Sequence, residues 1–200
     1  MNKTILFDLD GVLVDACDWH YEALNLALLQ FQKEPISRDH HLTLYNGLPT
    51  HVKLEMMGIS EDVANQINRL KQVYTLTTIR SKAKHMPEKI TLHSYLKSNG
   101  YKIACVTNSI KETATEMLKA TGQFDFMDLL ITNEDVKNNK PSPDCYNLAM
   151  EKLNADPRKT IIVEDSPKGM QAAKASNATT CIRVKDPSQV TIDIISPYLE

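Results

Sequence analysis

The chain has 200 residues, a length that suits one domain or one domain with a modest insertion. Hydrophobic residues make up 42% and charged residues 24%, and the formal net charge is -2, so no basic field predicts nucleic acid or an anionic membrane as a partner. No apolar run approaches the roughly 20 residues of a membrane-spanning helix. We also expect no signal peptide, because Asp8 and Asp10 interrupt the first apolar run.

The cysteines are scattered rather than paired. They are Cys17, Cys105, Cys145 and Cys181. Their spacing contains no C-x-x-C pair, so neither a disulfide framework nor a zinc site is expected. Reduced, isolated thiols are typical of a cytoplasmic protein, which is the location we expect. Nothing in the sequence demands more than a monomer.

The first part of the chain predicts one strand and then a run of helices. Residues 3–7 are apolar and β-rich, as in a short buried strand. Helical patterns follow over residues 19–32, 37–45, 50–57 and 60–84. The stretch Asn46-Gly47-Leu48-Pro49 is expected to break them.

After Pro87, strands and helices alternate. Strands are expected over residues 102–106, 129–132, 160–163 and 180–184. The first helix of this part covers 88–98 and ends at Asn99-Gly100. Later helices are expected to begin at three serines: Ser109 in a capping box with Glu112, and Ser142 and Ser166, each before a proline.

This alternation predicts an α/β fold: a Rossmann-like parallel sheet with helices on both faces. Residues 1–14 and 85–200 would form this core domain, and residues 15–84 would form an inserted all-helical domain. In such sheets, ligands bind outside the carboxyl ends of the strands.

Polar residues follow several of the predicted strands. The strand ends carry Asp8-Leu9-Asp10-Gly11, Thr107-Asn108-Ser109 and Glu164-Asp165-Ser166, and Lys140 precedes another helix. Taken singly, each group has an ordinary explanation as a helix cap or a solvated loop residue. Four such groups at one sheet edge predict a functional site.

The residue types indicate what this site binds. Carboxylates that crowd together need a cation or raised pKa values. Oxygen ligands without nearby His or Cys suit Mg²⁺. A lysine, a hydroxyl group and helix N–H groups beside that ion form a phosphate site.

The spacing of Asp8 and Asp10 predicts different catalytic roles for the two carboxylates. Residues two apart on an extended strand project the same way, so both carboxylates can reach one substrate. Asp8 can attack phosphorus and form an aspartyl-phosphate. Asp10 can protonate the leaving oxygen and later deprotonate water. Lys140 would reduce the repulsion between carboxylate and phosphate oxygens.

These motifs resemble those of the haloacid dehalogenase superfamily. Phe-Asp-Leu-Asp-Gly-Val-Leu-Val-Asp at 7–15 is similar to its first motif, and Val-Thr-Asn-Ser at 106–109 to its second. Lys-Pro-Ser-Pro-Asp at 140–144 is similar to the third motif, and Val-Glu-Asp-Ser-Pro-Lys-Gly at 163–169 to the fourth.

The resemblance implies a role for each residue. Asp8 matches the nucleophile, Asp10 the acid/base, and Lys140 the phosphate-neutralising lysine. Thr107 and Asn108 match the pair that holds the phosphate. The implied Mg²⁺ ligands are Asp8, the backbone carbonyl of Asp10 and Asp165, with Glu164 in support.

The helical insertion resembles the α-helical cap that selects the substrate in this superfamily, with β-phosphoglucomutase-like and sugar-phosphate phosphatase members nearest. His20 stands where the mutases carry a histidine at the cap hinge. The stretch 47–51 lacks the arginine with which they grip a second phosphate. Lys71 is one possible replacement charge; Arg69 and Arg80 are others.

The leading hypothesis is therefore a Mg²⁺-dependent phosphatase acting on a small phosphorylated metabolite such as a sugar phosphate. The alternative is a phosphosugar mutase with the same nucleophile. A receiver domain that acts as a phosphorylation switch would also combine acids, a hydroxyl and a lysine. Receivers, however, keep the acid pair and the phosphorylated aspartate on separate strands and carry no cap. A sugar-phosphate binding protein without activity would fit if the site were substituted, but no catalytic position is.

Overall fold

The computed structural model describes residues 2–45 and 48–199. The chain divides into two compact units, Met1–Asp15 with Lys84–Glu200 and Ala16–Ala83. Among the described helices, none combines the length and the apolar character needed to cross a bilayer.

The first unit, the core unit, is built on a five-stranded sheet. Its strands are β1 (Asn2–Phe7), β2 (Lys102–Val106), β3 (Leu129–Ile131), β4 (Ala155–Glu164) and β5 (Thr180–Arg183). They lie in the order β3-β2-β1-β4-β5, and every neighbouring pair is parallel. The predicted parallel α/β sheet is confirmed. Phe7 at the end of β1 pairs with both Cys105 and Val163, so Asp8 emerges between the ends of β2 and β4.

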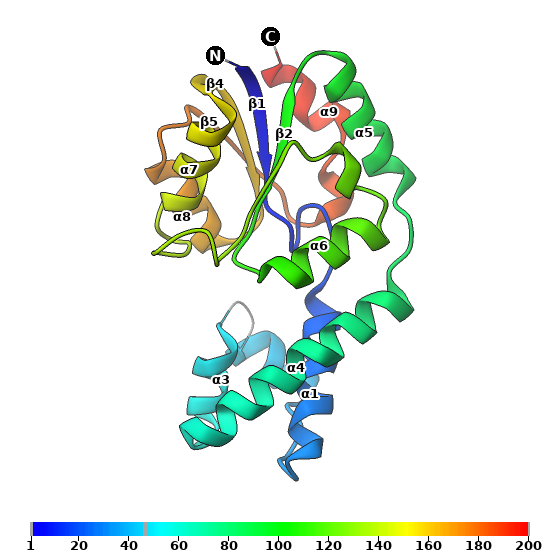
Figure 1. Ribbon diagram of the computed structural model, residues 1–200, viewed down its shortest axis with the longest axis vertical. Helices are drawn as coiled ribbons and strands as arrows, with labels where there is room; N and C mark the ends of the chain where they lie inside the picture. The colour runs from blue at the N-terminus through cyan, green and yellow to red at the C-terminus, as the bar shows by residue number, and fades with distance from the viewer. Residues whose placement is uncertain (1, 46–47, 200) are drawn as a thin grey trace. The chain divides into compact units, whose positions relative to one another are not determined.

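Helices cover both faces of this sheet (Figure 1). The helices are α5 (Pro87–Ser98), α6 (Lys111–Ala120), α7 (Asp144–Leu153), α8 (Pro167–Ala175) and α9 (Ile192–Ile195). Three short 3-10 helices are η2 (Phe124–Phe126), η3 (Pro187–Gln189) and η4 (Ser196–Tyr198). Figure 1 shows α7 and α8 on one face and α5 and α9 on the other.

Alternating strand residues supply the two layers of the core. Leu6 and Ile162 belong to a buried cluster with Tyr146 of α7 and Ala172 of α8. Phe7 points the other way and meets the ring of His93 on α5 edge-on, with 5.6 Å between ring centroids. This period of two is what a sheet buried on both faces requires.

The second unit, the helical unit, contains α1 (Cys17–Gln30), α2 (Arg38–His40), the π-helix η1 (His41–Tyr45), α3 (Thr50–Met56) and α4 (Glu61–Lys82). It has a core of its own, in which Leu24 and Leu28 of α1 pack with Leu54 of α3 and Ile67 of α4. The expected helical character is confirmed. Of the expected break at 46–49, Asn46 and Gly47 lie outside the described residues.

Two predicted helix starts are wrong. Helix α6 begins at Lys111 with Ile110 as its N-cap and no side-chain cap. The hydroxyl of Ser109 donates instead to Asp10, and the Lys111 N–H donates to Glu134 at 2.6 Å. Ser142 likewise bonds to Asp144 rather than capping α7. In both places a nearby carboxylate competes with the local cap.

Other boundaries shift for a simpler reason. Strand β4 starts at Ala155, five residues before the expected start, because a polar stretch hides the strand pattern there. The third predicted start is confirmed: Ser166 accepts the Gly169 N–H at 3.0 Å, with Pro167 opening α8.

His93 makes the core unit sensitive to acid. Its ring is fully buried, and Nε2 lies 3.0 Å from the side-chain oxygen Oε1 of Gln123. Burial lowers the pKa of His93 from 6.5 to about 4. Between those pH values the unfolded chain binds the proton more readily, so stability falls as the pH drops through this window. Across this window the unfolding free energy falls by about 3 kcal/mol, at about 1.4 kcal/mol per unit of pKa difference between the folded and unfolded states.

We therefore expect His93→Gln to flatten the dependence of the unfolding free energy on pH between 6.5 and 4. Urea titrations at several pH values measure this slope. His85→Gln, which changes an exposed histidine of the same unit, is the control. Equal slopes in the wild type and His93→Gln would contradict the assignment.

Candidate active site

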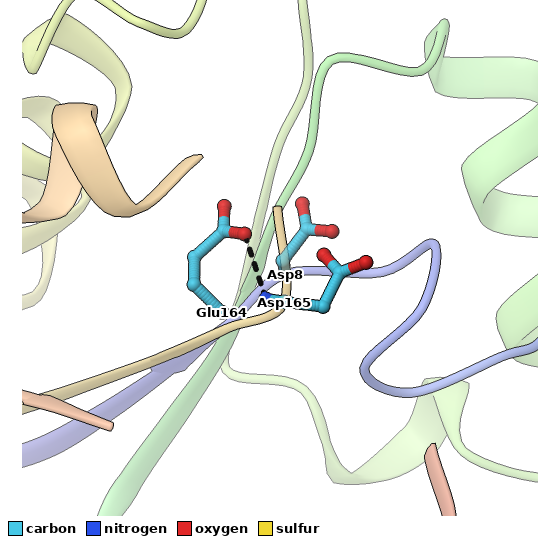
Figure 2. A group of neighbouring side chains, drawn as sticks. All are labelled: Asp8, Glu164 and Asp165. Carbon is cyan, nitrogen blue, oxygen red and sulfur yellow. Dashed lines mark hydrogen bonds between the residues drawn. The ribbon is translucent and has the colours of Figure 1, made fainter. Parts of the chain in front are cut away.

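Three carboxylates meet at the carboxyl edge of the sheet. Asp8 follows β1, Glu164 ends β4 and Asp165 comes next. One possible ligand atom from each lies within 4.8 Å of the others. Figure 2 shows the three side chains together, with the Asp165 N–H donating to Glu164 Oε2 at 3.0 Å. The sheet thus brings together acids that are more than 150 residues apart in sequence.

Lys140 lies among these carboxylates. Its Nζ donates to Asp8 Oδ1 at 2.6 Å, to Glu164 Oε1 at 2.7 Å and to the carbonyl of Val106 at 2.8 Å. The side chain is buried, which alone would lower the lysine pKa. The negative charges around it, that of Asp8 foremost, nevertheless raise this pKa well above its usual value. Lys140 is therefore an ammonium ion that uses all three of its protons.

Asn108 and Tyr146 hold this lysine in place. The Asn108 amide bonds to the backbone N–H of residue 140 at 3.1 Å and to its carbonyl at 3.2 Å. The ring of Tyr146 lies under the ammonium, 4.8 Å from Nζ to the centroid. Its hydroxyl donates to Glu164 Oε1 at 2.7 Å. Sequence reasoning missed Tyr146, because a buried helix residue at core spacing gives no sign of a polar contact.

Asp10 and Thr107 share a third partner. Ser109 donates its hydroxyl to Asp10 Oδ2 at 2.9 Å, and its backbone N–H to Thr107 Oγ1 at 3.0 Å. Thr107 is buried, whereas Asp10 is partly exposed. Ser109 was interpreted from sequence as a helix cap. The only sequence signal for the contact between Ser109 and Asp10 was the position of Ser109 directly after Thr107 and Asn108.

The site holds more negative charge than Lys140 neutralises. Burial raises the pKa of Asp8 well above its usual value, with Glu164 and Asp10 adding to the shift and Lys140 opposing it. Burial, followed by the charge of Glu164, raises the pKa of Asp165 from 3.8 to about 6. Asp165 Oδ1 is buried without a hydrogen-bond partner among the described residues. An unsatisfied buried carboxylate oxygen is costly.

Two glycines let the backbone approach these acids. Gly11 has φ +87°, and a Cβ there would overlap the Asp165 carboxylate. A Cβ at Gly169 would overlap the carboxylate of Glu164. The result is a compact, oxygen-only donor set with surplus negative charge and an unpartnered oxygen. These residues fit a hard divalent cation.

The remaining candidate residues belong to the helical unit. Lys71 Nζ lies 3.3 Å from His20 Nδ1, so α1 and α4 bring together two residues that were each predicted separately to contact substrate. Lys71 is buried, and Arg69 and Arg80 are exposed on the same helix.

Comparison with known proteins agrees with the arrangement of these motifs. The sequence pattern of haloacid dehalogenase-like hydrolases matches residues 5–183. The chain is 29% identical over 183 residues to a phosphorylated carbohydrates phosphatase of Thermotoga maritima, covering 87% of this chain and 81% of the relative. It is 31% identical over 206 residues to hexitol phosphatase A of Escherichia coli, covering 99% of this chain and 92% of the relative.

Solved structures show the same fold. A β-phosphoglucomutase from Clostridium difficile superposes with a TM-score of 0.81 at 24% identity, over 99% of this chain and 97% of that one. The match to the family pattern spans most of the chain and contains all the acids of the edge site. The chain belongs to the haloacid dehalogenase-like hydrolases.

Proposed function

We propose that the chain is a Mg²⁺-dependent phosphatase that hydrolyses a small phosphorylated metabolite, such as a sugar phosphate, through an aspartyl-phosphate on Asp8. The observation that carries this proposal is the placement of Lys140. Its ammonium bridges Asp8 and Glu164 beside a cluster of acids suited to a cation. Nucleophile, positive charge and metal ligands would then surround one phosphoryl group.

Asp8, Asp165 and the backbone carbonyl of Asp10 would hold the metal, with Glu164 in support. When bound, Mg²⁺ neutralises charge on the phosphoryl oxygens and on the carboxylates. Asp165 Oδ1, which has no partner among the described residues, is a suitable ligand atom.

Asp8 performs the first step. One carboxylate oxygen attacks phosphorus, an oxygen–phosphorus bond forms, and the bond to the leaving alcohol breaks. Lys140 holds Oδ1 at 2.6 Å and thereby fixes the rotamer of the nucleophile. Its positive charge reduces the repulsion between this carboxylate and the phosphate.

Asp10 moves the protons. It gives a proton to the leaving oxygen and becomes a carboxylate. In the second step it takes a proton from water, whose oxygen attacks phosphorus and releases Asp8 and inorganic phosphate. The hydrogen bond from Ser109 at 2.9 Å orients Asp10 for both transfers.

Thr107 and Asn108 have different roles at the phosphate site. Thr107 Oγ1 accepts the Ser109 N–H, so its own proton is available to a phosphate oxygen. Oδ1 of Asn108 and one of its two Nδ2 protons bond to the backbone of residue 140, so this side chain positions the lysine loop. We assign phosphate contact on this strand end to the Thr107 hydroxyl, the second Nδ2 proton of Asn108 and backbone N–H groups.

The helical unit is proposed as the cap that selects the substrate, with His20 and Lys71 as its contacts to substrate. The two named relatives support a phosphorylated carbohydrate as the substrate class.

No two of the four cysteines, all within the described residues, form a disulfide, which supports a cytoplasmic location.

Asp8→Asn is expected to abolish phosphate release while the protein stays folded, because the amide is nearly isosteric but cannot act as the nucleophile. The loss should exceed about 10³-fold, as expected when the group that forms the covalent intermediate is removed. Asp193→Asn, at an exposed carboxylate of α9, should retain wild-type activity. Turnover by Asp8→Asn above about one thousandth of the wild-type rate would exclude Asp8 as the attacking group.

Asp165→Asn tests the metal. Because its folded pKa of about 6 lies above the usual 3.8, the native state binds a proton more readily, and stability falls as the pH rises through this range. At pH 7.5 without metal, we expect the variant to melt about 3 °C above wild type. Adding Mg²⁺ should raise the melting temperature of wild type and have little effect on the variant. An equal Mg²⁺ response in both proteins would contradict the ligand assignment.

A panel of phosphorylated sugars and sugar alcohols, with and without a sugar bisphosphate, separates the phosphatase from a mutase. We expect Mg²⁺-dependent release of inorganic phosphate, since residues 47–51 offer no arginine for a second phosphate group. Phosphate and sugar isomers are measured in the same reactions. Isomerisation that needs the bisphosphate and releases no phosphate would favour the mutase.

A further inference from the structure

The thiol of Cys17 lies in an environment unlike that of the other cysteines. Cys17 is the first residue of the 14-residue helix α1, which has no side-chain cap, and it is partly exposed. Its Sγ lies 3.6 Å from Nε2 of His41, on η1 of the same unit. Helix N-termini and neighbouring cations both favour the thiolate form of cysteine.

The hydrogen bonding of His41 fixes which atom carries the proton. The ring is buried and packs against Tyr21 with 4.8 Å between centroids. Burial, and then the charge of Lys53, lower the pKa of His41, so the imidazole is neutral and carries one proton. Nδ1 is buried with no partner among the described residues, so a proton there would be an unpaired donor. The proton therefore belongs on Nε2, and the sulfur is its acceptor.

Lys53 on α3 adds a positive charge that needs an anion. Its side chain is 8% exposed and makes no hydrogen bond or ion pair with the residues that the structure describes. Burial lowers its pKa, and the charge of Cys17 acts in the opposite direction. A buried ammonium without a counter-charge is strongly unfavourable. A thiolate at Cys17 is the anion that would offset it.

Two neighbours of Cys17 on α1, Asp18 and His20, contact basic side chains of the same unit. Asp18 is next to Cys17, but it is ion-paired with Arg38 of α2. The hydrogen bond that Arg38 donates to Asp18, and to a lesser extent the charges of Asp18 and Cys17, raise the pKa of Arg38. His20, one turn further along α1, lies against Lys71 of α4. The negative charge of Asp18 is therefore already balanced by Arg38.

We propose that Cys17 is held as a thiolate at neutral pH by His41, Lys53 and the start of α1, and that it is a site of modification by hydrogen peroxide. The thiolate attacks one peroxide oxygen, an S–O bond forms and the O–O bond breaks. The leaving hydroxide takes a proton from solvent and becomes water. Sulfur is oxidised by two electrons to a sulfenic acid, and the peroxide is reduced.

The remaining cysteines provide the contrast. Burial raises the pKa of Cys145 to about 11 and also raises the pKa values of Cys105 and Cys181. Cys181 is partly buried like Cys17 and belongs to β5, so it serves as an internal control in the same molecule.

The first test is the pH profile of alkylation of the intact protein by iodoacetamide, followed by mass spectrometry of the peptides that contain Cys17 and Cys181. We expect the Cys17 rate to reach half its maximum below about pH 7.5, whereas an ordinary thiol does so near about 8.5. A Cys17 midpoint at or above that of Cys181 would overturn the proposal, and no variant is needed for this comparison.

Lys53→Met should raise the Cys17 midpoint by about one pH unit, and Lys53→Arg, which keeps the charge, should leave it near the wild-type value. Lys33→Met, at an exposed lysine of the same unit, is the matched control. An unchanged midpoint in a folded Lys53→Met protein would exclude Lys53 as the counter-charge.

The second test exposes the intact wild-type protein to hydrogen peroxide in the presence of a sulfenic-acid trap such as dimedone. The adduct is expected on Cys17 before Cys181. A lack of adduct on Cys17 would contradict its assignment as a peroxide site, even if the alkylation profile showed a thiolate.

Discussion

The contact between Lys140 and the carboxylates of Asp8 and Glu164 is the interaction on which the core site depends. A buried ammonium is tolerated only where anions and acceptors surround it, and here two carboxylates and a carbonyl take its three protons. The same contact joins β1, β2, β4 and the loop before α7. Removing either acid would leave the buried lysine with one carboxylate instead of two, so the charges of the site and its architecture depend on one another.

The sheet order explains why this contact can form. Strand β1 is central, with β2 and β4 on either side, so the residue after Phe7 lies between two other strand ends. Gly11 and Gly169 then remove the side chains that would hold the neighbouring backbone away from Asp165 and Glu164. The crowding of like charges in the site is thus a product of the fold, and it favours a cation.

The sequence was sufficient to predict the parallel sheet and its helices, because alternation of apolar strands with amphipathic helices follows directly from burial on both faces. The polar groups of the site were also visible, since Asp8 and Asp165 follow predicted strands and Lys140 precedes a predicted helix. Ser109 was counted among the polar residues at a strand end but was interpreted as a helix cap, and Tyr146 was not recognised as a partner of the site. A serine before a helix has the same local pattern whether it caps that helix or bonds to a distant acid. Tyr146 has the spacing of a core residue, and only three-dimensional packing shows what its hydroxyl meets.

Asn108 contacts the main chain of residue 140 rather than its side chain. The loop's path is consequently specified by groups that every amino acid possesses, whereas the charge it presents is specified by one side chain. A substitution at position 140 could therefore change the charge of the site without changing the path of the loop. Shape and reactivity are encoded here by separate residues, and so they are free to evolve at different rates.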